Sequence, residues 1–254
     1  MLTHQLLALP VAALAGLAAV FLFGGVVKGV TGVGLPLVLV PLTAQFLPLP
    51  STIILLSMAM VVTNITQAAE GGHTIATIRA LWPILVALIA GTVIGVHLLI
   101  HIDRRLLNAI LGVSFLSLAV LLLCLPRVRL NPRIVGPAGP LVGFGAGVLG
   151  GMSAMFGPPM IAYLVGLGTD PDAFVKRMAI FAFTASTTML IALGGSGSLS
   201  PSDLAVSLAA LVPIQLGMPL GRWLRRRTSP TRFRLAVLAI LAAGGLDLLH
   251  RAFF

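Results

Sequence analysis

A glycine-rich stretch near the N-terminus has the residue types that bind an anion inside a membrane protein. Residues 24–36 contain five glycines and Pro36, and this composition opposes a continuous helix. A helix that restarts after Gly34 would present unpaired N–H groups and the positive end of its dipole, an arrangement that favours an anion. Lys28 would add a cation beside that helix start, and Thr31 a hydroxyl group. The stretch therefore predicts an interrupted helix that binds a negatively charged ligand.

A second stretch, residues 147–158, repeats this composition and offers Ser153 and another helix start before Pro158. Two helix N-termini that face each other would form an anion site with few charged side chains. Two alternatives stay open: the glycines could only permit close helix packing, and Lys28 could be an interfacial anchor that snorkels to water. The candidate substrate-binding residues from the two stretches are Lys28, Gly29, Thr31, Gly32, Gly34, Gly150, Gly151, Ser153 and Gly157.

Polar side chains also interrupt two long apolar segments. Intramembrane Asn, Ser and Thr are costly without partners, so they should face the interior of a helix bundle. There they could donate to a bound oxyanion, or they could only join helices by hydrogen bonds. Asn64 is the strongest of these candidates. The full set comprises Thr63, Asn64 and Thr66 in the first half and Thr184, Ser186 and Thr187 in the second.

The elements that position these residues follow from composition. The 254 residues are 58% hydrophobic and 9% charged, with a mean hydropathy of +1.11, whereas a soluble domain has roughly 25% charged residues. Too few charged side chains remain to form a solvated surface. A water-soluble enzyme, a disordered chain and a nucleic-acid-binding domain are thereby disfavoured. No run alternates polar and apolar residues as a barrel strand must, so we expect an all-α integral membrane protein.

A helix needs about 20 apolar residues to cross the hydrocarbon core. Residues 35–47 and 158–167 are shorter than this, and each follows a glycine-rich stretch. We therefore expect about ten hydrophobic segments, namely eight full spans and two short broken helices. The eight long stretches are residues 6–27, 51–69, 80–100, 106–125, 134–149, 172–193, 204–220 and 231–249.

The two halves of the chain resemble each other. An offset of 121 aligns residues 23–29 with residues 144–150, and also Pro50 with Pro171 and Thr63 with Thr184. Residues 1–128 and 129–254 are therefore expected to be two repeats. If each has five crossings, an odd number, the second repeat is inverted in the membrane. Inverted repeats with broken helices are a transporter architecture.

Positive charges predict the orientation. Six of the sixteen Lys and Arg residues lie in residues 222–234, and cytoplasmic loops are enriched in such residues. The arginine-rich loop 222–234 is thus predicted to be cytoplasmic in a multi-pass protein of the inner membrane. The other charges favour ten crossings with both termini outside, and eight spans with two re-entrant pieces stay open. No Lys or Arg precedes the first apolar stretch, so we expect that segment to be retained.

Other chemistries have less support. Cys124 is the single cysteine, and the carboxylates lie at segment ends. His97 and His101 share a helix face and could form a metal site with Glu70 and His73, but two His at the end of a span usually reflect the interface. We expect no cofactor, no metal and no enzymatic activity. A passive anion channel and a metal-cation transporter remain alternatives.

The glycine-rich residues 23–41 and 144–159 resemble those of the TauE/SafE family of sulfite exporters and toluenesulfonate uptake permeases. The resemblance implies transport of a small sulfur-containing or organic anion, such as sulfite or a sulfonate, across the inner membrane. The hypothesis is a secondary transporter in which two inverted halves give alternating access to the anion. Its expected partners are a small anionic substrate and the lipid bilayer, but no nucleic acid, and a homodimer stays open.

Overall fold

The computed structural model describes residues 2–31, 35–69, 74–124, 132–169, 171–225 and 230–253, and these residues form helices joined by short turns, with no strand among them. The all-helical expectation is confirmed. The helices are α1 (Leu2–Leu7), α2 (Val11–Thr31), α3 (Leu35–Thr43), α4 (Leu49–Ala69), α5 (Thr74–His101), α6 (Arg104–Cys124), α7 (Pro132–Ser153), α8 (Gly157–Gly166), α9 (Pro171–Gly195), α10 (Pro201–Ala209), α11 (Leu211–Arg225) and α12 (Pro230–Phe253).

Four stretches of the described helices are long and apolar enough to cross a membrane. They are Val11–Val30, Thr74–His101, Ala173–Gly195 and Pro201–Leu224, and the apolar stretch Leu49–Ile65 in α4 is shorter. These lengths do not test the count of ten segments, which stays a prediction.

Three predicted boundaries were wrong. The first apolar segment is divided into α1 and α2, because Pro10 has no N–H group and disfavours the helical conformation of the residue before it. The segment 204–220 is divided at Ala210, where Pro213 cannot donate to the preceding turn. The first glycine-rich stretch stays helical as far as Thr31, so the predicted interruption does not begin at Gly24, and residues 32–34 lie outside the described residues.

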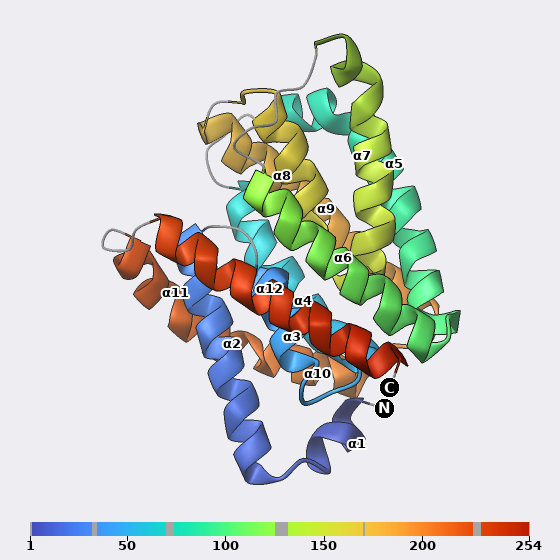
Figure 1. Ribbon diagram of the computed structural model, residues 1–254, viewed down its shortest axis with the longest axis vertical. Coiled ribbons are helices and arrows are strands. Elements are labelled where there is room, and N and C mark those ends of the chain that lie inside the picture. The colour runs from blue at the N-terminus through green and yellow to red at the C-terminus, as the bar shows by residue number, and fades with distance from the viewer. Residues whose placement is uncertain are drawn as a thin grey trace.

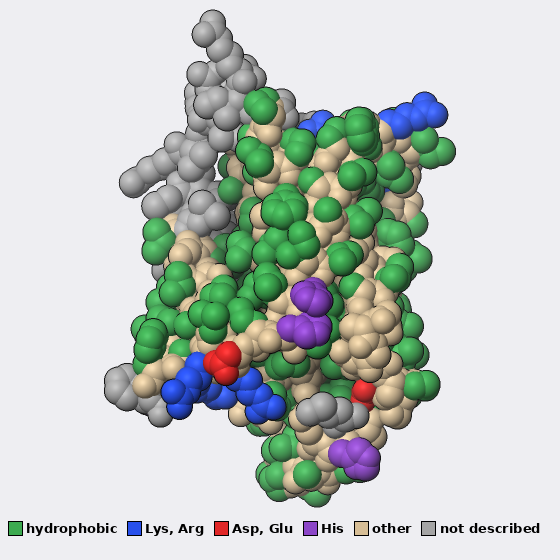
Figure 2. All heavy atoms as spheres, turned by 90° about the vertical axis from the view of Figure 1, so that its right-hand side faces the viewer, with side chains coloured by type: hydrophobic (Ala, Val, Ile, Leu, Met, Phe, Trp, Pro, Cys, Tyr) green, Lys and Arg blue, Asp and Glu red, His purple; other side chains and the backbone are tan. Residues whose placement is uncertain are grey.

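Apolar side chains cover the outside of the molecule, as expected of a protein that contacts lipid. Val86 in the middle of α5, Val113 in α6 and Ile191 in α9 are all more than half exposed. Figure 2 shows hydrophobic side chains over most of one face, with Lys and Arg near its two ends. Several polar side chains, in contrast, lie in the interior. This distribution of polarity reverses that of a soluble protein.

Two helix pairs pack through glycine faces. In the pair of α2 and α11, a methyl group on Gly25 would collide with the carbonyl oxygen of Ile214, and one on Gly29 with that of Met218. In the pair of α5 and α7, a methyl group on Gly147 would collide with the carbonyl oxygen of Leu88. Small residues let helix backbones approach closely in membranes. For these glycines the structure therefore supports the close-packing interpretation.

The remaining helices complete the bundle around these pairs. α4 packs against α9, and α6 packs against α12. Figure 1 shows α5 beside α7, α2 beside α11, and α6 and α12 lying across the front of the molecule. The N-terminal helix α1 and the end of α12 lie at the same end of the molecule.

Candidate functional site

Lys28 lies in the last turn of α2 and points into the protein, with 3% of its surface exposed. Its Nζ donates to Thr63 Oγ1 at 3.0 Å and to Asn64 Oδ1 at 2.8 Å, both in α4. A lysine that snorkels would instead be exposed, so the interfacial-anchor alternative is wrong. The ammonium group sits between two helices that are distant in sequence.

Asn64 extends this contact to the second half of the chain. Its Nδ2 donates to the Ala182 carbonyl oxygen at 3.3 Å and to Ser186 Oγ at 3.4 Å, both in α9. Asn64 is 7% exposed, and Thr63 and Ser186 are fully buried. The structure thus joins four of the predicted residues, in helices α2, α4 and α9, by one chain of hydrogen bonds.

A cavity of about 50 Å³ lies beside this chain. Among the described residues, Lys28 and Asn64 are its polar side chains. The rest of its wall is mostly apolar and consists of Leu35, Pro36, Leu37, Met60, Ala154, Met155, Phe156, Gly157, Ile161, Met178 and Ala182. Because few polar groups surround it, a charge in this cavity would interact strongly with the Lys28 ammonium.

Both short helices begin at the cavity wall. α3 starts at Leu35 and α8 at Gly157, and both residues line the cavity. Before α8 the chain leaves α7 through Ala154, whose φ of 62° is unusual for a residue with a side chain. Phe156 then precedes the first turn of α8 without a side-chain cap. The N-termini of two interrupted helices and one buried cation thus meet at one small cavity.

The model of the sulfite exporter TauE/SafE family matches residues 17–248, which extend from α2 into α12 and include both interruptions. The chain belongs to the sulfite exporter TauE/SafE family. Membership in this family and the apolar helices make it a multi-pass membrane protein of a transporter family. No curated protein and no solved structure matches the chain.

Other predicted residues of this TauE/SafE protein lie at helix contacts rather than in the cavity wall. Gly29 faces α11, Gly151 faces α5, and Gly150 lies under the Phe156 ring. Ser153 Oγ donates to the Leu149 carbonyl oxygen at 2.6 Å, and Thr184 Oγ1 to that of Ile180 at 2.9 Å.

Thr187 Oγ1 is buried and has no hydrogen-bond partner, and Thr187 does not line the cavity. Gly32 and Gly34 lie outside the described residues, as do the side chains of Thr31 and Thr66.

Much of the cavity wall was missed by reasoning from the sequence. Met60, Met155 and Met178 are almost fully buried, and each lines the cavity. Met60 lies one helical turn before Asn64 and therefore shares its helix face, a signal that spacing could have provided. Met178 carries no such signal, because only the packing of α9 brings it there.

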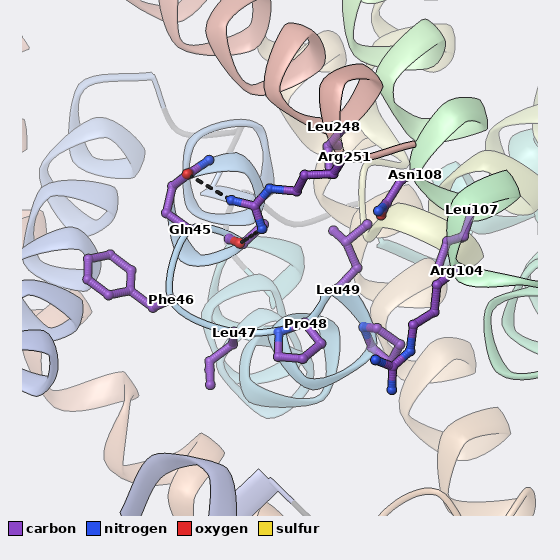
Figure 3. Close-up of a pocket in the computed structure, with 12 residues that line it drawn as sticks. Gln45, Phe46, Leu47, Pro48, Leu49, Arg104, Leu107, Asn108, Leu248 and Arg251 are labelled. Atoms are coloured by element: carbon purple, nitrogen blue, oxygen red, sulfur yellow. Dashed lines mark hydrogen bonds between the residues drawn. The ribbon is translucent and has the colours of Figure 1, made fainter. Parts of the chain in front are cut away.

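A second and larger cavity, of about 330 Å³, lies between the turn after α3, the start of α6 and the end of α12. Figure 3 shows Arg104, Asn108 and Arg251 at its wall. Arg251 is paired with Asp247 at 2.8 Å and also donates to Gln45 Oε1 at 3.0 Å. Arg104, Gln45 and Arg251 are exposed. Water therefore screens this cavity far more than it screens Lys28.

The predicted metal ligands do not gather in the described part of the chain. His97 and His101 are exposed, and their rings stack at 4.1 Å. No group of three His, Cys, Asp or Glu residues that could hold a metal occurs among the described residues. Glu70 and His73 lie outside them.

Proposed function

We propose that the chain is a secondary transporter for a small sulfur-containing anion, such as sulfite or a small sulfonate, which binds beside Lys28 in the cavity between the two helix interruptions. The two halves would give access to this cavity from each side of the membrane in turn. The proposal extends the family assignment to a substrate, a site and a mechanism.

The observation that carries the proposal is the buried amino group of Lys28. Burying an unpaired charge is costly, and an anion in the cavity would remove that cost. Lys28 donates to two neutral oxygens, and no contact to a carboxylate is found for it in the described ranges. An anion in the cavity would be the missing opposite charge, and the first turns of α3 and α8 would add N–H donors.

The dimensions of the cavity favour a small substrate. A volume of about 50 Å³ suits a few water molecules or a small ion, since about 10–15 Å³ suffices for one water molecule. Three methionines and Phe156 form apolar walls around it. We infer that a small oxyanion binds with its charged oxygens toward Lys28 and Asn64, and that a bulky aryl sulfonate would require a wider cavity.

Helix contacts support two related halves. When the helices α2, α3, α4, α5 and α6 are exchanged in order for α7, α8, α9, the pair α10–α11, and α12, the most extensive contacts are preserved. The pair α2 and α11 becomes α7 and α5, and the pair α3 and α12 becomes α8 and α6. The exchange turns the pair of α4 and α9 into itself, and it does the same with the pair of α6 and α12. Helix pairs that a twofold axis relates behave in this way.

Single residues follow the same exchange with an offset of 122. Gly25 and Gly147 differ by this number, as do Gly29 and Gly151, and both pairs hold matching places in the glycine faces. Asn64 and Ser186 also differ by 122, and they bond to each other where α4 meets α9. This offset replaces the 121 of the sequence alignment and pairs Thr31 with Ser153. Each half contributes five elements, so the proposed repeat is inverted.

The orientation of the protein in the membrane is part of the same proposal. α1 and the end of α12 lie at the same end of the molecule, as an even number of crossings requires. We propose that the protein lies in the inner membrane, with this end outside and the arginine-rich loop 222–234 in the cytoplasm. A homodimer stays a prediction.

Uptake by the purified protein in lipid vesicles tests the function. Vesicles preloaded with unlabelled sulfite should exchange it for external ³⁵S-labelled sulfite, and excess thiosulfate or methanesulfonate should compete. Lys28→Ala should reduce this exchange at least about tenfold, because a hydrogen bond to a charged group contributes about 1.5–3 kcal/mol. Lys176→Arg is the matched control, since Lys176 is a half-buried lysine outside the cavity. Equal exchange by wild type and Lys28→Ala would contradict the site.

The same vesicles distinguish a carrier from a passive channel. A carrier exchanges labelled for unlabelled anion faster than it allows net flow, whereas a channel produces electrical currents that a carrier cannot reach. The small cavity, lined by methionine and phenylalanine side chains, favours the carrier.

A further inference from the structure

Lys28 donates two hydrogen bonds, and whether its amino group has a third hydrogen depends on its protonation. Thr63 Oγ1 donates its own hydrogen to the Ala59 carbonyl oxygen at 2.7 Å, and Asn64 uses its amide group to donate to α9. Both oxygens that face Lys28 therefore act as acceptors. A neutral amine has two hydrogens and can satisfy both oxygens. The third hydrogen, present only in the ammonium form, remains for the cavity.

An acidic group near Lys28 would stabilise its ammonium form even without an anion. The positions of the charged and titratable groups on the neighbouring elements therefore matter. Asp203 bonds to Ser200, Asp247 pairs with Arg251, and Asp103 caps α6, all away from the cavity. The acidic residues Glu70, Asp170 and Asp172 belong to segments whose side chains are not described.

Basic and phenolic neighbours are also directed elsewhere. On α11, Arg222 is exposed. On α9, Lys176 Nζ donates to the Ala68 carbonyl oxygen and to Thr74 Oγ1, both at 2.8 Å. On α8, the Tyr163 hydroxyl lies against Gly139 of α7. None of these side chains lines the cavity, and neither does the half-buried Arg177 of α9.

With these neighbours, an occupied cavity favours the protonated form of Lys28, and an empty cavity favours the neutral form. An anion stabilises the ammonium, whereas an empty cavity leaves a buried charge with neutral partners, which is unfavourable. We propose that Lys28 binds one proton with each anion and releases it when the anion leaves, so that the protein is an anion–proton symporter. This inference rests on the proposed function and adds its coupling ion.

Release of the anion is coupled to the loss of one proton from Lys28. When the anion leaves, one N–H bond of the ammonium breaks, its electron pair stays on Nζ, and the proton passes to water on the side that receives the anion. The neutral amine keeps its hydrogen bonds to Thr63 and Asn64 while the empty protein returns to the other side. Anion and proton then cross together, and the empty carrier moves without a buried charge.

Accumulation of labelled sulfite in vesicles tests the coupling. The membrane potential is held at zero with K⁺ and valinomycin, the outside is one pH unit more acidic than the inside, and the uptake of protein-free vesicles is subtracted. One proton per anion predicts about tenfold accumulation, because one pH unit corresponds to about 1.4 kcal/mol, a tenfold ratio. A protonophore should abolish it. The conservative control Lys176→Arg should accumulate sulfite as the wild type does.

The variant Lys28→Arg decides whether Lys28 carries the proton. A guanidinium keeps its charge in proteins, so this variant should exchange labelled for unlabelled sulfite but should lose the accumulation. Accumulation equal to the wild type would mean that sulfite brings its own proton, and it would overturn the inference. A folded variant without exchange would also contradict it, because a permanent cation should still hold the anion.

Thiosulfate provides a second measurement that needs no variant. It stays fully ionised between about pH 5 and 9, so a proton that crosses with it must be carried by the protein. Thiosulfate uptake by the wild type that follows the pH gradient supports the inference, and uptake that ignores the gradient overturns it. Sulfite exchange without any response to pH would refute the symport and leave the proposed function intact. No sulfite exchange at all would refute the proposed function.

Discussion

Lys28 in α2 and Gly150 in α7 hold matching positions, because each lies between two glycines of a packing face: Gly25 and Gly29 in α2, Gly147 and Gly151 in α7. The surroundings of the two positions differ. Lys28 projects a cation into the cavity, whereas Gly150 makes room for the ring of Phe156, another cavity residue.

Helix packing and the chemistry beside the cavity therefore differ independently between α2 and α7. The glycine faces must keep their shape in both halves, since backbone oxygens of the neighbouring helix lie against them. The positions that face the cavity are free to differ. Among the described residues, Lys28 is the one cation in the cavity wall.

Replacing the cation by an apolar chain of similar length should have the largest effect on transport. Lys28→Met should reduce sulfite exchange more than about tenfold, through loss of a charge-assisted hydrogen bond of about 1.5–3 kcal/mol. Its thermal stability should be equal or higher, because folding without the anion no longer requires either a buried ammonium or its deprotonation. A melting curve and an exchange assay on the same preparation measure both quantities. Parallel losses of stability and exchange would assign Lys28 a structural role.

The glycine faces should respond in the opposite manner. In Gly147→Ala the new methyl group would meet the backbone of α5, and such overpacking typically costs about 1–3 kcal/mol. Gly145→Ala is the matched control in the same helix, since no atom lies within 4 Å of the added methyl group. This control should be neutral or more stable by about 0.5–1 kcal/mol. Equal melting temperatures for the two variants would rule out a close contact at Gly147.

Gly150→Ala should have a smaller effect on stability than Gly147→Ala. The added methyl group meets a phenylalanine ring, which can rotate away at a cost of about 0.5–1.5 kcal/mol. The ring would move at the cavity wall, so the half-saturating sulfite concentration should change by a few-fold. An altered melting temperature with an unchanged half-saturating sulfite concentration would show that Phe156 takes no part in sulfite binding.

Ser186→Ala should have the smallest effect. It removes the long hydrogen bond of 3.4 Å from Asn64, which keeps its bond to the Ala182 carbonyl oxygen. We expect a decrease in exchange of a few-fold at most, since a hydrogen bond contributes about 0.5–1.5 kcal/mol. Loss of exchange as large as in Lys28→Met would show that Asn64 is positioned mainly from α9.

Residue type predicted part of the site well. Lys28 and Asn64 stand out as costly groups in an apolar segment, and the structure brings them together. Glycine content was less informative. It marked both stretches but did not tell which glycines permit helix contact, as at Gly29, and which line the cavity, as at Gly157. The same composition serves both purposes, and only the neighbouring helix distinguishes them.

Composition and the lengths of apolar runs were sufficient to predict a helical membrane protein, whereas the two similar halves stay a prediction. These properties are local, because a backbone in lipid must satisfy its own hydrogen bonds within each helix. The tertiary structure decided that α3 and α8 begin at one cavity, that three methionines form its wall, and that Lys28 faces α4 rather than water. Such contacts join residues more than a hundred positions apart, and no local pattern specifies which distant helix lies beside a given face.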